Sequence, residues 1–203
     1  KNEDKIVGVL GFISTSTKDL ANVFTVIWKV EENNGNPVLG IQMFNYLENL
    51  NGVQNVLSVG INKKTLPIFK HLNIYTNKLN QYVLINKKLQ KFKIATVPKN
   101  KKKVIKSTKY LDLFDIKKIN DSIDLDKFDF SKYKCDIPYK SKGYFIKRYF
   151  KHPIYNYDVY AVFHDKKIVS LYVTRVQPYN NSNVIRIVDF IGDQNTIYSF
   201  SNY

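Results

Sequence analysis

The residues best suited to acid–base chemistry lie near the end of the chain. Asp189 stands in an otherwise apolar run, three positions after Arg186, and His152 directly precedes Pro153. A lone buried carboxylate is costly, so Asp189 must be paired, exposed or functional. A salt bridge with Arg186 or Arg175 and a catalytic role both stay open for Asp189, while His152 is either a turn residue or a catalytic group.

The spacing of Arg186 and Asp189 decides whether they can act together. In a regular strand their side chains point to opposite faces, because their separation is odd. A β-bulge between them would bring both side chains to one face. A shared polar site is therefore expected only if the strand carries such a bulge.

A second chemical signal is a strand, a loop and a helix near the start of the chain. Residues 22–30 are rich in β-branched and aromatic types, a loop with Gly35 and Pro37 comes next, and helical spacing begins near Gly40. The first turn of a helix has free backbone N–H groups and the positive end of the helix dipole. This segment favours a phosphate-bearing ligand, unless Gly40 is only a turn residue.

These groups need strands and helices to position them. The sequence predicts helices at 40–49, 65–72 and 143–152, and strands at 6–13, 22–30, 55–61, 155–164, 167–177 and 183–191. It also predicts closing strands near Tyr75, at 79–86 and at 92–97, and a turn at 178–182. The expected class is α/β in the broad sense, with the first two strands as an antiparallel hairpin.

Composition narrows the classes of function. Among 203 residues, 44% are hydrophobic, which is enough for a packed core, and no apolar run has the roughly 20 residues of a membrane helix. Cys135 is the only cysteine, so a disulfide within the chain and a cysteine zinc site are excluded, and a cytoplasmic location is expected. No metal site is predicted.

The net charge of +15 attracts anions but does not indicate specific nucleic-acid binding. All but three of the 32 basic residues are lysines, spread evenly along the chain, whereas arginine makes the bidentate contacts to bases. A basic nucleic-acid-binding protein remains an alternative, and it predicts affinity that falls steeply with salt.

The two ends of the chain resemble each other. Residues 5–10 match 167–172, and residues 22–27 match 183–188. The expected domains are a first lobe at 1–97, a charged connector at 98–138 and a second partial lobe at 139–203. If the repeat is real, the first copy lacks its opening elements, and the second copy lacks the loop and the elements after that loop.

Residues 5–86, and more weakly 139–203, resemble the GNAT superfamily of acyl-CoA N-acyltransferases. The resemblance implies a central, mixed, mostly antiparallel sheet flanked by helices, and acetyl-CoA or another acyl-CoA as co-substrate. The strand before the loop would splay from its neighbour and pair with pantetheine, and loop amides would hold the pyrophosphate. The implied cofactor-binding residues are Val30, Val38, Leu39, Gly40, Ile41 and Asn62, with helix capping as the alternative role of Asn62.

The first copy departs from the GNAT pattern at two places. The family's loop usually reads Gln/Arg-x-x-Gly-x-Gly/Ala, whereas Gly35, Val38 and Gly40 stand here, so only the last glycine is kept. Many members carry a tyrosine as general acid where this chain has Phe69, which has no proton to give. Tyr75 is the nearest hydroxyl that could replace it.

The second copy resembles GNAT-like proteins of bacterial surface-polysaccharide pathways, through residues 148–157, Arg175 and residues 186–192. This implies transfer of an acyl group to the amine of a small-molecule acceptor, with amino sugars among the candidates. Asp189, His152 and Tyr75 are the expected catalytic residues, and Trp28, Arg148 and Arg186 the expected substrate-binding residues. A non-catalytic GNAT-like binding or scaffold module is the alternative.

Overall fold

The computed structural model describes residues 5–32, 35–80, 82–83, 91–94, 113–200 and 203. The chain forms two compact units. The first unit comprises Lys1–Leu79 with Lys134–Tyr144, and the second comprises Asn80–Tyr133 with Phe145–Tyr203. The segment 98–138, which was expected to be a connector, is therefore divided between the two units.

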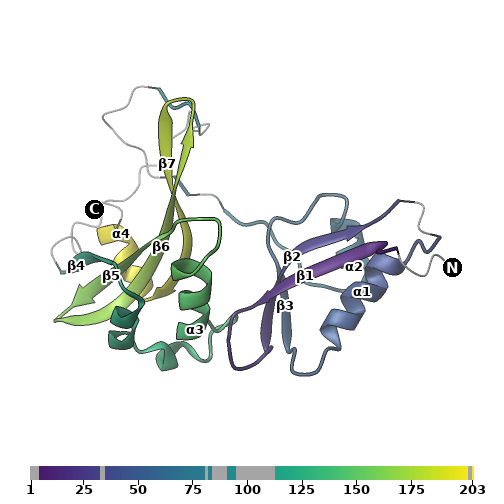
Figure 1. The fold of residues 1–203 in the computed structure, drawn as a ribbon, viewed down its shortest axis with the longest axis horizontal. Helices are drawn as coiled ribbons and strands as arrows, with labels where there is room; N and C mark the ends of the chain where they lie inside the picture. The colour runs from purple at the N-terminus through teal and green to yellow at the C-terminus, as the bar shows by residue number, and fades with distance from the viewer. Residues whose placement is uncertain (1–4, 33–34, 81, 84–90, 95–112, 201–202) are drawn as a thin grey trace. The chain divides into compact units, whose positions relative to one another are not determined.

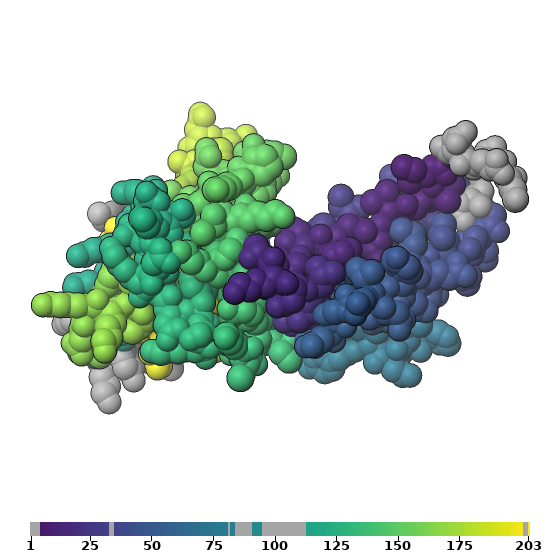
Figure 2. Space-filling model, turned by 60° about the horizontal axis from the view of Figure 1, so that its bottom comes forward, coloured from purple at the N-terminus to yellow at the C-terminus, as the bar shows by residue number. Residues whose placement is uncertain are grey.

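The first unit is built on a three-stranded sheet in the order β1-β2-β3 (Figure 1). β1 (Gly8–Ser14) and β2 (Asn22–Val30) form the predicted antiparallel hairpin, and β3 (Asn55–Ser58) pairs with β2 in parallel. The β1–β2 register shifts by one residue between Gly11 and Phe12, with Val26 as the extra residue of β2. Strands β1 and β2, purple in Figure 2, lie at the surface of this unit.

Two helices cover one face of this sheet, and one tryptophan anchors both. α1 (Leu39–Glu48) and α2 (Leu66–His71) match the helices predicted from apolar spacing. The Trp28 ring stacks on Phe44 of α1 at 5.3 Å between centroids and on Phe69 of α2 at 5.8 Å. Because Trp28 leaves β2 on a single face, both helices must lie on that face.

The second unit is a four-stranded antiparallel sheet in the order β4-β5-β6-β7. Its strands are β4 (Asp115–Ile119), β5 (Asp158–His164), β6 (Lys167–Tyr179) and β7 (Ser182–Gly192). The predicted turn between β6 and β7 is confirmed. Asn180 and Asn181 have φ values of 45° and 54°, the left-handed conformation that suits asparagine in tight hairpin turns.

Helical segments cover both faces of this second sheet. On one face, Phe200 of α4 (Ile197–Phe200) stacks on Tyr172 of β6 at 4.0 Å. On the other, η4, a π-helical segment at Ile146–Phe150, places Tyr149 against Asp189 of β7. The short helix α3 (Lys142–Phe145) directly precedes η4, and together they lie close to the predicted helix. The short helices η2 (Ser122–Lys127) and η3 (Phe130–Tyr133) also belong to this unit.

The expected connector is partly core. β4 pairs with β5, and Leu125, Phe128 and Phe130 are buried. Alternating acids and lysines concealed this, because the apolar side chains of 3₁₀ turns follow no long helical or strand period. The expectation that residues 98–138 lie outside the core is therefore wrong for residues 113–133, whereas residues 134–137 are exposed. Residues 98–112 lie outside the described residues.

The class is mixed α+β, as expected, but the strands form two sheets and not one central sheet. No strand is present at 73–80, 82–83 or 91–94, and the rest of the predicted closing strands falls outside the described residues. Within the part of the chain that the structure describes, no helix is long and apolar enough to cross a membrane.

The internal repeat is visible in the geometry of the two hairpins. The register of β6 and β7 shifts between Val173 and Thr174, with Val188 as the extra residue. These positions lie 162 residues after Gly11, Phe12 and Val26, the site of the shift in the first hairpin. The first predicted match has this offset, whereas the predicted match of 22–27 with 183–188 is off by one residue. The two hairpins therefore carry a β-bulge at the same place, which supports the internal repeat.

The expectation that the second copy lacks a loop and helix needs correction. β7 leads through η5 (Gln194–Thr196) into α4, as β2 leads through a loop into α1. In each unit the helix places a phenylalanine, Phe44 or Phe200, on a ring of its hairpin. The apolar residues of this short helix were too few for a helical period to be recognised.

A buried group of hydroxyls ties η5 to β6. The Tyr172 and Thr196 hydroxyls are hydrogen-bonded at 2.9 Å, and Thr196 donates to the Ser170 oxygen at 2.9 Å. Ser170 in turn donates to the Asp193 carbonyl at 3.0 Å. Burial raises the pKa of the Tyr172 phenol to about 12, so the neutral form is held in the folded protein.

This phenol predicts a loss of stability at high pH. Tyr172 ionises at about pH 10 in the unfolded chain, so its contribution is full below that pH and is lost as the pH rises through the folded pKa of about 12. Urea unfolding at about pH 8 and about pH 11 should show a larger loss in the wild type than in Tyr172→Phe, which lacks the titrating group. At the lower pH, the free energy of unfolding of Tyr172→Phe should be about 1 kcal/mol below that of the wild type. Equal losses in the two proteins would contradict this assignment.

Candidate functional site

The first candidate site begins where β2 and β3 part. Their parallel pairing runs only from Asn22 with Asn55 to Thr25 with Ser58, and the last two side chains are hydrogen-bonded to each other. β3 ends there, whereas β2 continues to Val30. The predicted strand at 55–61 is therefore shorter than expected, and its early end leaves one edge of β2 open.

The open edge presents the peptide groups of two residues. The Glu31 N–H donates to the Val7 carbonyl at 2.8 Å, so Glu31 faces the β1 side. Peptide groups alternate in direction along a strand, which turns those of Trp28 and Val30 to the opposite edge. No strand among the described residues pairs with that edge beyond Thr25.

The chain leaves β2 at Val30 and reaches the N-terminus of α1 at Leu39 through a loop. Val38 is its N-cap but offers no side-chain cap, and the first turn contains no acidic residue. The Val38 N–H donates to Asn36 Oδ1 at 3.1 Å and the Leu39 N–H to the Asn36 carbonyl at 3.3 Å. The N–H groups of Gly40 and Ile41 have no partner in the part of the chain that the structure describes, so two donors remain available for an anion.

Gly40, in the first turn of α1, lies next to β2. A Cβ at Gly40 would be 3.4 Å from Trp28 Nε1 and 3.5 Å from a methyl group of Val30. These are ordinary van der Waals distances, so the spacing of α1 and β2 does not require a glycine here, and both interpretations of Gly40 stay open. Five of the expected cofactor-binding residues lie in this segment, together with Trp28: Val30, Val38, Leu39, Gly40 and Ile41.

The other predicted residues of this unit have different surroundings. Asn62 Oδ1 accepts a hydrogen bond from the Lys64 N–H at 3.0 Å, which closes a turn before α2. The N-cap of α2 is Thr65, so the expected helix-capping role of Asn62 is wrong. Phe69 is 3% exposed and stacks on Trp28, so it is a core residue. Tyr75 is 84% exposed, and its hydroxyl accepts from Asn77 Nδ2 at 3.0 Å.

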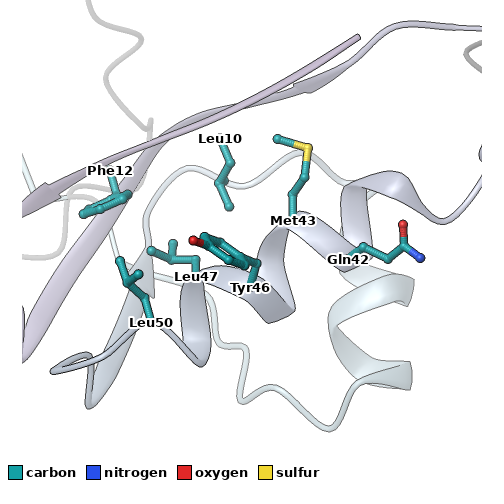
Figure 3. Close-up of a pocket in the computed structure, with 7 residues that line it drawn as sticks. All are labelled: Leu10, Phe12, Gln42, Met43, Tyr46, Leu47 and Leu50. Atoms are coloured by element: carbon teal, nitrogen blue, oxygen red, sulfur yellow. The ribbon is translucent and has the colours of Figure 1, made fainter. Parts of the chain in front are cut away.

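A separate cavity of about 340 Å³ lies between β1 and α1 of the same unit (Figure 3). It is lined by apolar side chains with one amide and one phenol: Leu10, Phe12, Gln42, Met43, Tyr46, Leu47 and Leu50. None of the residues predicted for chemistry is among them. The cavity is therefore a gap beside β1 and not part of the first candidate site.

The second candidate site is a polar face of the β6–β7 hairpin. Arg186 is paired with Arg175, and Asp189 is paired with Val173. Because Val173 and Arg175 are two residues apart on β6, all these side chains leave the sheet on the same face. The bulge that was required to bring Arg186 and Asp189 together is therefore confirmed.

Hydrogen bonds fix Asp189 and His152 in separate ways. Tyr149 of η4 donates its phenol hydrogen to Asp189 Oδ2, and the Phe190 N–H donates to Oδ1 at 2.8 Å. His152 Nδ1 accepts from the N–H groups of Ile154 and Tyr155, at 3.1 and 2.9 Å. His152 is thus a turn-capping residue with its proton on Nε2, which favours the structural interpretation over a catalytic one.

Aromatic rings surround this polar face. The His152 ring stacks on Tyr155 at 5.1 Å, and the Arg175 guanidinium carbon lies 4.4 Å from the Tyr155 ring centre. Sequence reasoning missed Tyr149, which was expected only as part of the helix predicted at 143–152. The π-helical turn that aims it at Asp189 leaves no pattern in the sequence. Arg148 is half-buried in the same segment.

No family model matches the sequence, and no curated protein or solved structure matches it either. Among the described residues, no group of three or more histidine, cysteine or acidic side chains is placed to hold a metal ion. The function must therefore be inferred from the geometry of the two candidate sites and from the expectations that the residues raised.

Proposed function

We propose that the chain is an acyl-CoA-dependent N-acyltransferase of GNAT type, in which the first unit binds acyl-CoA. The observation that carries this proposal is the open edge of β2 beside the uncapped N-terminus of α1. An extended chain with amide groups can pair with the free peptide groups of Trp28 and Val30. A pyrophosphate suits the free N–H groups of Gly40 and Ile41, and the positive net charge favours it.

Acyl transfer to an amine forms an N–C bond and breaks the C–S bond of the thioester. The amine must lose a proton and the leaving thiolate must gain one. Asp189 is the proposed acceptor of the amine proton, because its carboxylate is fixed by Tyr149 and the Phe190 N–H. Tyr75 is the proposed proton donor, since Phe69 cannot serve. The proposed acceptor is a small molecule with an amino group, with amino sugars among the candidates, and the proposed location is cytoplasmic.

The proposal predicts opposite effects of one substitution on stability and on binding. Val38→Asp places a carboxylate at the N-cap of α1, where it can accept from the free N–H groups and raise stability by about 1 kcal/mol. The same carboxylate repels a phosphate, so we expect at least a tenfold loss of acetyl-CoA affinity. Thermal denaturation with and without acetyl-CoA measures both effects.

Val38→Asn is the matched control, because it offers a similar cap without the charge. It should keep the higher melting temperature and lose less affinity than Val38→Asp. The proposed binding site is refuted if saturating acetyl-CoA does not stabilise the wild type. It is also refuted if acetyl-CoA stabilises Val38→Asp as much as the wild type.

A second candidate function is acyl-CoA binding without catalysis. It is favoured by Phe69, which fills the position of the usual acid with a buried core ring. This candidate predicts that acetyl-CoA stabilises the protein while no amine in a broad panel is acylated. Acylation of any amine that is lost in Asp189→Asn would decide for the enzyme.

A further inference from the structure

Two of the three arginines in this chain lie directly opposite each other. Arg175 of β6 and Arg186 of β7 are register partners, so their side chains rise side by side from one face of the hairpin. Like charges at directly opposite positions destabilise a pair of strands. The arrangement therefore has a cost in the free protein that an anion between the two guanidinium groups would remove.

The first hairpin shows that the fold itself does not need this pair. At the equivalent positions, 162 residues earlier, Ile13 is the register partner of Phe24. Both of those side chains are apolar and half-buried. A bulged hairpin of this kind is thus built with an ordinary apolar pair, and the two arginines replace it only in the second unit.

Contacts hold one of the two arginines in place and leave the other open. The Arg175 guanidinium stacks on the Tyr155 ring and its Nη2 donates to Gln177 Oε1 at 3.4 Å. Arg186 is exposed and has no hydrogen bond or ion pair within the described residues. A preorganised guanidinium beside a free one can together grip the several oxygens of a phosphate group.

One carboxylate shares this face. Asp189 lies opposite Val173, two residues along β6 from Arg175, which corresponds to about 7 Å along the strand. Its two oxygens accept from Tyr149 and from the Phe190 N–H. The face thus combines two positive groups with one carboxylate a short distance away, which is complementary to a small molecule with both a phosphate and an amino group.

We propose that Arg175 and Arg186 bind a phosphate group, and that this phosphate belongs to the amine-bearing acceptor. The second half of this inference rests on the proposed function. The phosphate fixes the acceptor on the arginine pair, and its amino group then lies toward Asp189. A phosphorylated amine is therefore the substrate class of this site.

Calorimetric titration of the full chain with inorganic pyrophosphate tests the arginine pair. We expect Arg186→Gln to weaken binding by about tenfold, whereas Lys167→Gln, which removes one exposed charge at the start of β6, should change it less than about twofold. Arg186→Lys keeps the charge but loses the planar fork, so it should also weaken binding several-fold. Melting temperatures no lower than that of the wild type would show that the variants are folded, and Arg186→Gln should be slightly more stable because it removes the repulsion between the two arginines.

Two outcomes would overturn the arginine site. If Lys167→Gln weakens binding as much as Arg186→Gln, the anion responds only to net charge, as for nonspecific nucleic-acid binding. If Arg186→Lys binds like the wild type, the geometry of the pair has no role.

The acceptor half has its own test with phosphoethanolamine and ethyl phosphate. The wild type should prefer phosphoethanolamine, and Asp189→Asn should remove the preference. No preference for phosphoethanolamine would overturn the acceptor half of the proposal.

If the arginine pair binds pyrophosphate but acetyl-CoA does not bind, the proposed function fails and the phosphate site stands. Acetyl-CoA affinity that is unchanged in Arg186→Gln would show that the two sites are separate.

Discussion

Replacing Gly192 with alanine should lower the free energy of unfolding by about 4 kcal/mol, from steric overlap and backbone strain together. Gly192 ends β7 with φ at 129°, where side chains are strained. An added Cβ would lie 2.4 Å from the Ser170 Cα and 2.4 Å from the Val169 carbonyl oxygen. Both atoms belong to the backbone of β6, so neither can move away cheaply. Urea unfolding measures the effect.

Gly60→Ala is the matched control for this prediction. Gly60 also has a positive φ, 74°, but a Cβ there would meet no atom within 4 Å. It should cost only about 1 kcal/mol, the cost of the left-handed backbone alone. Similar losses in the two variants would mean that the hairpin end is loosely packed.

Replacing Phe44 with alanine should cost about 3–5 kcal/mol. Phe44 is 2% exposed and contacts both Trp28 and Phe69, at 5.3 and 5.5 Å between ring centres. The substitution removes the ring that holds α1 against β2. Chemical unfolding monitored by the fluorescence of the single tryptophan should show the loss directly, because the probe lies in the same cluster.

The control is Tyr46→Ala on the same helix. Tyr46 is 73% exposed, so its loss should change stability by less than about 0.5 kcal/mol. The two substitutions have a similar effect on helix propensity. The difference between their losses of unfolding free energy therefore measures the contribution of the aromatic cluster. If Tyr46→Ala were as harmful as Phe44→Ala, helix propensity and not ring packing would hold α1 in place.

In the proposed function, the first unit binds acyl-CoA and the second unit binds the acceptor. The first unit offers backbone donors and an open strand edge, which suit a long cofactor with amides and phosphates. The second unit offers charged side chains on a rigid hairpin, which suit a small polar acceptor. Each site can be tested with its own ligand, so failure at one does not obscure the result at the other.

Local patterns predicted most of the individual elements. The strand Asn22–Val30 has its predicted bounds, α1 and α2 begin within one residue of prediction, and the turn of the second hairpin lies where asparagines come after Pro178. These features depend on side-chain periodicity and on turn chemistry, which are properties of neighbouring residues. The prediction failed for residues 113–133, because their apolar side chains match neither the helical nor the strand period.

The candidate sites were only partly accessible from the sequence. The strand, loop and helix near Gly40 could be recognised, and so could the condition that a bulge must join Arg186 to Asp189. The bulge itself, the partner Tyr149 and the pairing of Arg175 with Arg186 were decided by the register of β6 against β7 and by the π turn of η4. Register depends on contacts between distant residues, whose sum no local pattern contains. The sequence by itself determined which residues could do chemistry, and the tertiary structure decided which of them face each other.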